Sequence, residues 1–479
     1  MLSTSTPFSF ILFGASGNLA KLKIYPSLYV LALKNRLPAE YAIVGYARTD
    51  MNHQTFRTFV REAIVEDMKE VNEEVLGAFL ARVHYQRGNY DNTEDFTALR
   101  QTLEGLERGW KDTVRLAYLS IPPTVFTDVL EGLCAGKVHQ KDKPFRCIVE
   151  KPVGHDLASF EKIRTALTGC FTDDEIYLLD HYLGKEAVRN IYYLRYANPV
   201  LERVFKNTLI RHVEITASEP MGLDGRAGYF EQAGTLQDFF QSHLLMMASL
   251  LTMRLENEDT FRDVRLNALE QFYLPPASDM NDVVLQGQYA PGVVDGKPVR
   301  GYLEEEGVAK DSRTNTFIAL KLLTRMSRWQ GIPFYLRSGK RLLKKETRIS
   351  IAFQVPRPVG EGSAPNRLDI ILQGEAGMRL HLQTKIGGVE PRFRPLILED
   401  PLVCIGDCLP EHGLLLLEAI HGWKQWYLTF DEIRTSWRLI DPVQTHLQTP
   451  DTPLHIYPAG APGPEEADAW IARDGVRWF

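Results

Sequence analysis

The sequence has few cysteines, no strong excess of charge of either sign and no hydrophobic run long enough to cross a membrane. The apolar stretch nearest the N-terminus, Phe8 to Phe13, is six residues long and has no basic residue before it. It therefore predicts neither a signal peptide nor a membrane span, and we expect a cytoplasmic protein. Of the five cysteines, only Cys404 and Cys408 are close in sequence, and nothing near them completes a zinc site. We expect the cysteines to be buried free thiols.

The small net charge argues against a protein that binds nucleic acid. The formal net charge is −6 over 479 residues, and we find no basic stripe with interleaved aromatic residues, so we expect no binding to DNA or RNA. Hydrophobic residues make up 44% and charged residues 24% of the chain, as is typical of a globular protein. The length is too great for one hydrophobic core and indicates two large domains or three small ones.

The first residues predict a dinucleotide-binding unit. The apolar strand at residues 8–13 runs into the turn GASGNLA at residues 14–20, in which small residues let the backbone approach a pyrophosphate at a helix N-terminus. A second strand, at residues 41–45, follows at the distance expected for a strand, helix, strand unit. Pro26 either kinks the intervening helix or marks the start of its regular part near Tyr25.

The end of the second strand bears on the choice of cofactor. An NAD site places an acid there, whereas this chain has Arg48, whose planar guanidinium suits the 2′-phosphate of NADP. Asp50 keeps NAD as an alternative, and on position alone Arg48 is equally compatible with an exposed arginine at a strand end. Ser16 and Thr49 could add hydroxyl donors to the same phosphate, although both also fit ordinary turn chemistry.

Further apolar runs, at residues 114–121 and 147–150, extend the predicted parallel sheet, and each ends at proline. The second run leads into Glu150-Lys151-Pro152, a turn compatible with a cis peptide, from which Lys151 would point over the strand ends toward the cofactor. We place the domain boundary after this sheet. Residues 1–178 then form the dinucleotide-binding domain and residues 179–479 a second domain.

The segment DHYLGKE, Asp180 to Glu186, is a candidate anion site. It follows an apolar strand at residues 176–179 and opens a predicted helix. If that helix begins near Tyr182, His181 and Lys185 lie about one turn apart on one side, where a phosphate could accept hydrogen bonds from both and from backbone N–H groups. The alternative is that His181 caps the helix and Lys185 is a solvated surface charge.

The rest of the chain changes character. Strand-like segments without regularly alternating helices indicate a large antiparallel sheet at residues 212–217, 316–323, 348–355, 368–372 and 378–384. One segment, residues 234–254, predicts a long apolar helix with a single histidine, His243, and one acid, Asp238. A lone histidine on such a helix is more often a core residue than a catalyst. Beside Asp180 it becomes a candidate base that a carboxylate could stabilise when protonated.

Several motifs in a fixed order identify a family. They are GASGNLAKLKIYPSLY, GYAR, YLSIPPTVF, EKPVGHDLAS, DHYLGKE, SEPMGLDGRAGYF, QDFFQSHLL, GIPFYLRSGKR and YPAGAPGPEEAD. With them the chain resembles the glucose-6-phosphate dehydrogenase family over almost its whole length. The resemblance implies an α/β, Rossmann-like N-terminal domain, a larger α+β domain with a mostly antiparallel sheet that also forms the subunit interface, and a cleft between them. It implies a homodimer or a dimer of dimers that does not associate with membranes.

The resemblance also implies a reaction and its residues. Glucose 6-phosphate would be oxidised at C1 to 6-phosphogluconolactone, the first step of the oxidative pentose phosphate pathway, with hydride transfer to NADP and with NAD as a secondary cofactor. His243 resembles the general base and Asp180 the carboxylate that stabilises it. The phosphate would be bound by His181, Tyr182, Lys185 and Lys345. The sugar hydroxyls would be held by Lys151, Glu219, Asp238, Lys340 and Gln373. The cofactor would contact Gly14, Ala15, Ser16, Gly17, Asn18, Leu19, Ala20, Lys21, Arg48 and Lys151. We expect no metal site.

The chain departs from the family pattern at four places. Leu178-Leu179 stand where the family usually has Arg-Ile, Asn18 where it has aspartate, Phe126 where tyrosine is common, and Ser242 where asparagine precedes the catalytic histidine. These departures bear on cofactor affinity and rate. None of them replaces a matched catalytic residue.

Three other functions compete with this reading. A sugar oxidoreductase of the glucose-fructose oxidoreductase type acts on unphosphorylated sugars and needs no lysine cluster, so His181, Lys185 and Lys345 argue against it. A non-catalytic regulator that binds NADP or a sugar phosphate would be expected to lack Asp180 or His243, and both are present. A paralogue that acts on another hexose 6-phosphate stays open.

Overall fold

The computed structural model describes residues 6–255, 260–355, 364–402 and 404–479. The chain divides into two compact units, each described by itself below. The first comprises Met1–Lys185 with Gly406–Phe430, and the second comprises Glu186–Ile405 with Asp431–Phe479. The domain boundary that the sequence places near residue 178 stays a prediction.

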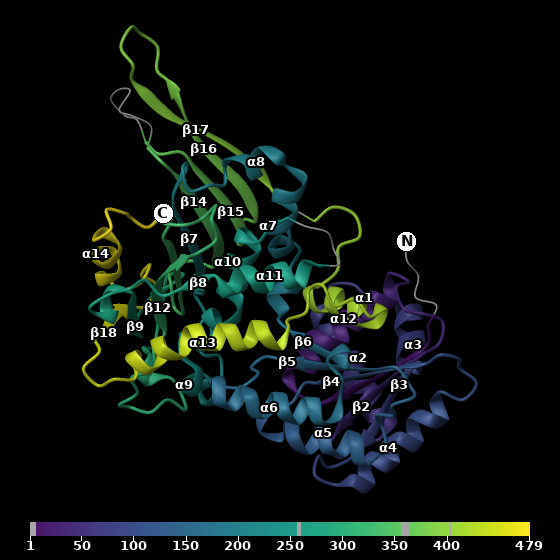
Figure 1. Ribbon diagram of the computed structural model, residues 1–479. Coiled ribbons are helices and arrows are strands. Elements are labelled where there is room, and N and C mark those ends of the chain that lie inside the picture. Colours follow the sequence, from purple (N-terminus) through teal and green to yellow (C-terminus); the bar gives the residue numbers. More distant parts are fainter. Residues whose placement is uncertain (1–5, 256–259, 356–363, 403) are drawn as a thin grey trace. The chain divides into compact units, whose positions relative to one another are not determined.

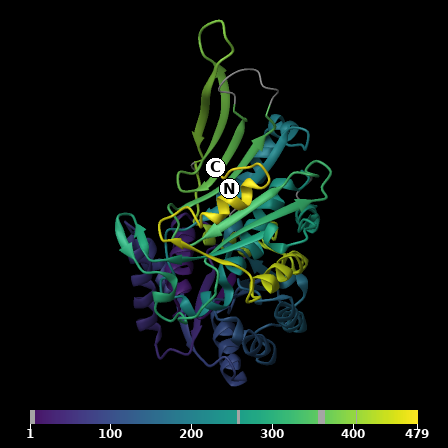
Figure 2. The same cartoon turned by 90° about the vertical axis from the view of Figure 1, so that its left-hand side faces the viewer.

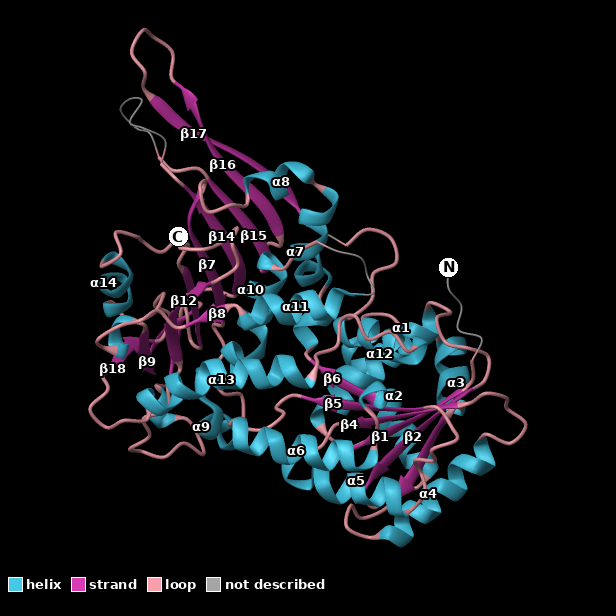
Figure 3. Cartoon of the chain, in the orientation of Figure 1, coloured by secondary structure: helices cyan, strands magenta, loops and turns pink. Residues whose placement is uncertain are grey.

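The first unit is built on a parallel sheet (Figure 3). Among the described residues it has six strands in the order β3-β2-β1-β4-β5-β6, and every neighbouring pair is parallel. Strands such as β1 and β4 are buried along their whole length, as expected where helices cover both faces of a parallel sheet. The strands are β1 (Phe8–Phe13), β2 (Tyr41–Ala47), β3 (Val83–Arg87), β4 (Val114–Leu119), β5 (Phe145–Glu150) and β6 (Ile176–Leu179). The helices are η1 (Ala20–Ile24), α1 (Tyr25–Leu33), α2 (His53–Asp67), α3 (Glu73–Ala81), α4 (Thr93–Leu106), η2 (Pro123–Val125), α5 (Phe126–Ala135), α6 (Leu157–Cys170), η3 (Asp173–Glu175), η4 (His181–Gly184) and α12 (Glu411–His421).

The buried strands of this sheet agree with the prediction. The five apolar runs correspond to β1, β2, β4, β5 and β6. The sequence does not reveal β3, because its residues alternate between buried and partly exposed positions and include no apolar run. Pro26 lies in the first turn of α1, which confirms the second of the two alternatives for that helix. The Lys151–Pro152 peptide is cis.

The second unit contains a large mixed sheet (Figures 1 and 2). In the part of the chain that the structure describes, the sheet has ten strands in the order β17-β16-β15-β14-β7-β13-β12-β9-β18, with β8 pairing at the side of β12. Its neighbouring pairs are antiparallel except β13 with β7 and β18 with β9, so the predicted antiparallel character is confirmed. The predicted segments correspond to β7 (Ile210–Ser218), β12 (Phe317–Thr324), β14 (Glu346–Phe353), β15 (Arg367–Gln373) and β16 (Gly377–Lys385). The other strands are β8 (Phe272–Tyr273), β9 (Val284–Ala290), β13 (Phe334–Gly339), β17 (Phe393–Pro401) and β18 (Leu454–Pro458), and β10 (Gly292–Val294) pairs separately with β11 (Lys297–Val299).

Helices accompany this sheet along much of its length. α7 contacts β15, and η5 contacts β7 and β13. The helices are α7 (Glu186–Ala197), α8 (Pro199–Val204), α9 (Ala227–Thr235), η5 (Leu236–Leu244), α10 (Leu245–Thr252), α11 (Phe261–Glu270), η7 (Met280–Asp282), η8 (Tyr302–Glu304), α13 (Phe430–Leu447) and α14 (Glu466–Ala472). None of the helices in the described residues is both long and apolar enough to cross a membrane.

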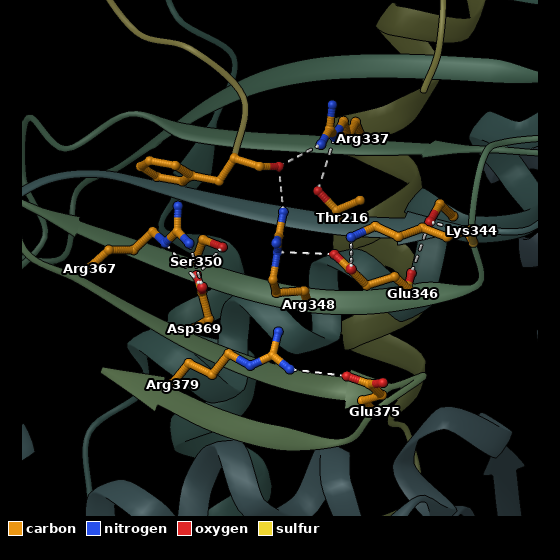
Figure 4. Close-up of polar contacts among 12 residues, drawn as sticks. Thr216, Arg337, Lys344, Glu346, Arg348, Ser350, Arg367, Asp369, Glu375 and Arg379 are labelled. Atoms are coloured by element: carbon orange, nitrogen blue, oxygen red, sulfur yellow. Dashed lines mark hydrogen bonds and ion pairs between the residues drawn. The ribbon is translucent and has the colours of Figure 1, made fainter. Parts of the chain in front are cut away.

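One face of the sheet carries paired charges (Figure 4). Side chains two residues apart on a strand share a face, so Glu346, Arg348 and Ser350 of β14 lie on one side. Arg348 Nε is 3.2 Å from Glu346 Oε1, and Ser350 Oγ donates to Asp369 Oδ1 of β15 at 2.6 Å. Burying charges requires such partners, and here β14 itself and the neighbouring β15 supply them.

The predicted helix over residues 234–254 is present in a modified form. Gly234 has φ of +56° and ends the regular part of α9, and a continuous helical segment follows as η5 and α10. η5 is π-helical over nine residues. Such helices are rare and often occur at functional sites.

The expectation of free thiols is wrong for four of the five cysteines. Cys134 of α5 and Cys170 of α6 form a disulfide with Cα atoms 6.1 Å apart, and Cys404 and Cys408 are also disulfide-bonded. The first pairing arises because α5 and α6 pack side by side and bring the two residues within bridging distance. Among the described residues only Cys147 of β5 is free, and burial raises the pKa of its thiol.

Candidate active site

The turn after β1 forms the cofactor part of the candidate site. Gly14 has φ of +76°, and a Cβ atom there would lie 2.0 Å from the carbonyl oxygen of Ser120, so only glycine fits. Gly14 N donates to Tyr46 O at 3.1 Å, and Gly17 N donates to Gly14 O at 2.9 Å. The closed turn leads directly into η1, which begins at Ala20. A strand, a tight turn and a helical start form the arrangement that binds a pyrophosphate.

Hydrogen-bond donors gather at the ends of β1 and β2. The Ser16 and Thr49 hydroxyls are 2.7 Å apart, and the exposed Arg48 guanidinium lies 5.6 Å from the centre of the Tyr90 ring. In this fold the adenosine ribose binds at the end of the second strand. A guanidinium and two hydroxyls there fit the 2′-phosphate of NADP, which NAD lacks.

Two charged residues beside this turn have partners of their own. Asp50, the alternative ligand for an NAD ribose, accepts from Arg87 Nη1 at 2.9 Å, and Lys21 pairs with Glu66 at 2.8 Å. Exposed pairs of this kind contribute about 0–1 kcal/mol. Either side chain can therefore turn toward a bound cofactor at small cost.

The segment after β6 corrects the helix prediction made for residues 180–186. His181–Gly184 form a 3-10 turn, Lys185 is extended with φ of −78° and ψ of 122°, and α7 begins only at Glu186. His181 and Lys185 therefore do not share the first turn of one α-helix. Asp180 Oδ1 accepts from Tyr182 N at 2.9 Å and caps the turn, while Leu183 N donates to Asp180 O and Lys185 N to Tyr182 O, each at 3.0 Å, in the three-residue spacing of a 3-10 helix.

The 3-10 turn nevertheless gathers the predicted substrate residues of the first unit. Lys185 Nζ is 3.7 Å from the centre of the buried Tyr182 ring, and the His181 and Tyr182 ring centres are 5.1 Å apart. Lys151 reaches the same end of the sheet, because Glu150 of β5 pairs with Leu179 of β6. Two cationic side chains and an imidazole are thus assembled at the carboxyl ends of parallel strands, where such sheets bind ligands.

Four strands of the second unit bring further predicted residues together at one edge of its sheet, where these strands begin or end. Ser218 of β7 pairs with Gly339 of β13 and with Glu346 of β14, and Thr347 of β14 pairs with Gln373 of β15. Residues at or just beyond these positions are therefore neighbours across strands. They are Glu219, Lys340, Lys345 and Gln373.

Lys340 is the centre of this edge. Its side chain is only 2% exposed, and Nζ lies 2.8 Å from Glu219 Oε2 and 3.5 Å from Asp238 Oδ2. Tyr229 donates to Asp238 Oδ1 at 3.4 Å, and burial and then the nearby Asp238 charge raise the pKa of the Tyr229 hydroxyl. A buried ammonium between two carboxylates is costly unless its partners hold it. The ammonium donates and the two carboxylates accept, so together they can bind a polyhydroxylated ligand.

His243 lies on η5, the helix that carries Asp238 and contacts β7 and β13. The residue is 4% exposed, its Nδ1 lies 3.5 Å from Ser242 Oγ, and its ring is nearly perpendicular to that of Phe239. At the sheet edge, Gln373 Oε1 accepts from Thr347 Oγ1 at 3.2 Å. The second unit therefore carries an imidazole, two carboxylates and a buried lysine on one sheet and one helix.

The sequence analysis did not single out a buried histidine of the first unit. His412, the second residue of α12, is 4% exposed, and its ring is nearly parallel to that of His181. Its Nε2 is 3.6 Å from Glu150 Oε1, to which the Tyr118 hydroxyl also donates. A histidine near the start of an apolar helix was visible in the sequence, but nothing there places that helix beside residue 181.

These features define a class of protein. A Rossmann-like sheet with a glycine turn is typical of enzymes that bind a nicotinamide dinucleotide. Lysines, carboxylates and a histidine arranged at the ends of strands supply the donors and the base that oxidation of a sugar alcohol requires. The chain has the construction of a nicotinamide-dependent dehydrogenase.

Comparison with known proteins gives the family. The model of the glucose-6-phosphate dehydrogenase NAD binding domain matches residues 11–190, and that of the glucose-6-phosphate dehydrogenase C-terminal domain matches residues 192–479. The chain belongs to the glucose-6-phosphate dehydrogenase family.

Individual relatives span the whole chain. It is 36% identical to a glucose-6-phosphate 1-dehydrogenase of Chlamydia pneumoniae, over 99% of this chain and 96% of that protein, and 34% identical to one of Rhizobium meliloti, over 98% and 97%. A solved structure of a glucose-6-phosphate dehydrogenase in complex with glucose 6-phosphate superposes with a TM-score of 0.90 at 30% identity, covering 100% of both chains. The chain is accordingly an oxidoreductase with a dinucleotide-binding domain.

Proposed function

We propose that this protein oxidises glucose 6-phosphate at C1 to 6-phosphogluconolactone and transfers the hydride to NADP. The observation that carries the proposal is the buried Lys340, held by Glu219 and Asp238 at the sheet edge next to the helix that bears His243. Family membership over the whole chain agrees with it. The same membership places the reaction at the start of the oxidative pentose phosphate pathway.

His243 is assigned the role of general base. Oxidation of an alcohol requires the hydroxyl proton to leave as the hydride departs, and a neutral imidazole can accept it. Asp180 keeps the role that the resemblance gives it, a carboxylate that stabilises the protonated base. When bound, NADP supplies the nicotinamide that accepts the hydride from C1.

The remaining assignments follow the chemistry of the substrate. The phosphate dianion is assigned to His181, Tyr182, Lys185 and Lys345, which offer charged and neutral donors. The sugar hydroxyls are assigned to two lysines that donate, Lys151 and Lys340, to two carboxylates that accept, Glu219 and Asp238, and to the Gln373 amide, which does both. For Lys340 and its two carboxylates, the contacts described above support this assignment.

NADP is the preferred cofactor in this proposal, with NAD as a weaker alternative. Arg48 is exposed over Tyr90, and Ser16 and Thr49 place two hydroxyls in contact at the end of β2. This donor set fits a 2′-phosphate and gives NADP contacts that NAD cannot make. Asp50, whose exposed pair with Arg87 opens at small cost, keeps NAD as the weaker alternative.

The second unit also supports self-association. β17 is an edge strand of the sheet in the described residues, and Leu396, Ile397 and Leu398 on it are 37%, 50% and 52% exposed. An exposed edge with consecutive apolar side chains is unusual unless another surface covers it. We propose a homodimer or a dimer of dimers, and sedimentation velocity of the purified protein tests it. The cytoplasmic location expected from the sequence stays a prediction.

One assay tests the proposed reaction. Purified protein is supplied with NADP or NAD and, in separate reactions, with glucose 6-phosphate, other hexose 6-phosphates or free glucose, and reduction of the cofactor is followed by absorbance. The proposal requires the highest kcat/KM with glucose 6-phosphate and NADP. A higher value with another hexose 6-phosphate would identify a paralogue, and binding without turnover would indicate a regulator.

A further inference from the structure

The imidazole ring of His412 lies against that of His181. The two ring centres are 6.1 Å apart and the ring planes differ by 7°, so the rings are offset and nearly parallel. His412 is 4% exposed, whereas His181 is partly exposed. One ring is therefore partly open to the solvent, and the ring beside it lies in the protein interior. Aromatic pairs at such separations stabilise a fixed ring orientation.

The backbone fixes the position of His412 relative to the 3-10 turn. α12 packs against η4, and the two come close at Gly184, where a Cβ atom would lie 2.4 Å from the carbonyl oxygen of Glu411. Glycine permits this contact because it has no side chain. Since Glu411 immediately precedes His412, this contact fixes the position of the His412 backbone beside η4.

The two ring nitrogens of His412 each lie near a carboxylate. Nε2 is 3.6 Å from Glu150 Oε1, and Nδ1 is 3.9 Å from Glu411 Oε1. The buried Tyr118 hydroxyl donates to the same Glu150 oxygen, and burial and the Glu150 charge raise the pKa of that hydroxyl well above its usual value. Tyr118 therefore remains a donor and helps to hold Glu150. Glu150 immediately precedes Lys151 in the chain.

His412 thus connects two segments that carry assigned substrate residues, His181 on η4 and Lys151 after β5. We propose that His412 is a positioning residue that holds the His181 ring in the orientation in which it binds the substrate phosphate. The proposal rests on the function proposed above, because it takes the assignment of His181 to the phosphate from there. His412 itself is not assigned a contact with substrate or cofactor.

The test compares two apolar replacements of similar size. His412→Leu fills the space without a flat ring, whereas His412→Phe restores a flat ring without the nitrogens. We expect His412→Leu to raise KM for glucose 6-phosphate roughly three- to tenfold, the effect of losing one aromatic pair, with kcat and KM for NADP within about twofold of wild type. His412→Phe should return KM for glucose 6-phosphate to within about twofold.

A matched control lies on the same helix. His421, the last residue of α12, stacks on Trp423 with ring centres 4.4 Å apart, so His421→Leu removes a similar contact away from η4. It should leave both KM values unchanged. Equal KM values for His412→Leu and wild type, equal defects in His412→Leu and His412→Phe, or a parallel rise in KM for NADP would each overturn the proposal.

A binding measurement separates this proposal from the proposed function. If wild type binds glucose 6-phosphate or inorganic phosphate in calorimetry but does not reduce NADP, the proposed reaction fails, and the Kd values then decide about His412. His412→Leu must weaken phosphate binding roughly three- to tenfold, as expected for KM, and His412→Phe must restore it. If wild type does not bind phosphate at all, both proposals are overturned.

Discussion

Replacement of Lys340 by methionine tests the arrangement at the sheet edge of the second unit. Methionine has a similar length and no charge, so the change removes the ammonium while filling most of its space. The lost interaction is charge-assisted, because Nζ donates to Glu219 Oε2 at 2.8 Å and, in the proposed role, to a sugar hydroxyl. Hydrogen bonds of this kind contribute about 1.5–3 kcal/mol, so kcat/KM for glucose 6-phosphate should fall about ten- to 150-fold.

The stability cost should be smaller than for a fully buried pair. Removing one partner of such a pair costs about 3–5 kcal/mol, because the other charge is left without compensation. Here the Glu219 and Asp238 side chains are 31% and 19% exposed and can be solvated. We therefore expect a loss of about 1–2 kcal/mol in the free energy of unfolding, measured by denaturant titration.

A neighbouring lysine provides the control for this experiment. Lys344 has a side chain that is 59% exposed and pairs with Glu346 on the charged face of the sheet (Figure 4). Lys344→Met should leave kcat/KM within about twofold of wild type, since exposed pairs contribute about 0–1 kcal/mol. If Lys340→Met were folded and kept wild-type kcat/KM, or if KM for NADP rose as much as KM for glucose 6-phosphate, the role given to Lys340 would be refuted.

Two further predictions concern single charges in the first unit. Lys185→Ala should lower kcat/KM for glucose 6-phosphate at least about tenfold, by the loss of one charged hydrogen bond, with little effect on the reaction of free glucose. Equal losses with both substrates would show that Lys185 is structural. Arg48→Ala should lower kcat/KM for NADP about ten- to a hundredfold and leave NAD nearly unchanged; equal losses with both cofactors would show that Arg48 acts through its contact with Tyr90 instead.

The parallel sheet of the first unit could be predicted because its strands carry their own signal. β1 and β4 are apolar at nearly every position, as burial on both faces requires. β3 has the sequence VHYQR and lacks that signal, so it was missed. Local patterns predict an element well when one environment surrounds the whole of it.

Features that depend on distant parts of the chain could not be predicted. The segment 406–430 belongs to the first unit although more than two hundred residues separate it from β6, and no local pattern records that return. The contact between Gly184 and Glu411, the ring pair of His181 and His412, and the Cys134–Cys170 disulfide all depend on such tertiary packing.

The candidate site shows both sides of this limit. The family resemblance pointed to Glu219, Lys340 and Gln373, and strand register brings their positions together at one edge. The helix expected at residue 182 was wrong because backbone bonds such as Lys185 N to Tyr182 O close a 3-10 turn there and Lys185 is then extended. A pattern of residue types indicates which groups take part, whereas the local geometry depends on individual hydrogen bonds.

The most direct test of the proposed reaction is the turnover of His243→Asn with glucose 6-phosphate and NADP, compared with wild type and with His421→Asn as a matched control outside the site. A positioned general base is typically worth about 10² to 10⁴ in rate. We therefore predict that kcat falls by that factor in His243→Asn, while KM for glucose 6-phosphate changes by no more than about threefold and His421→Asn behaves as wild type. A folded His243→Asn variant with a kcat near the wild-type value would contradict the assignment of His243 as the base.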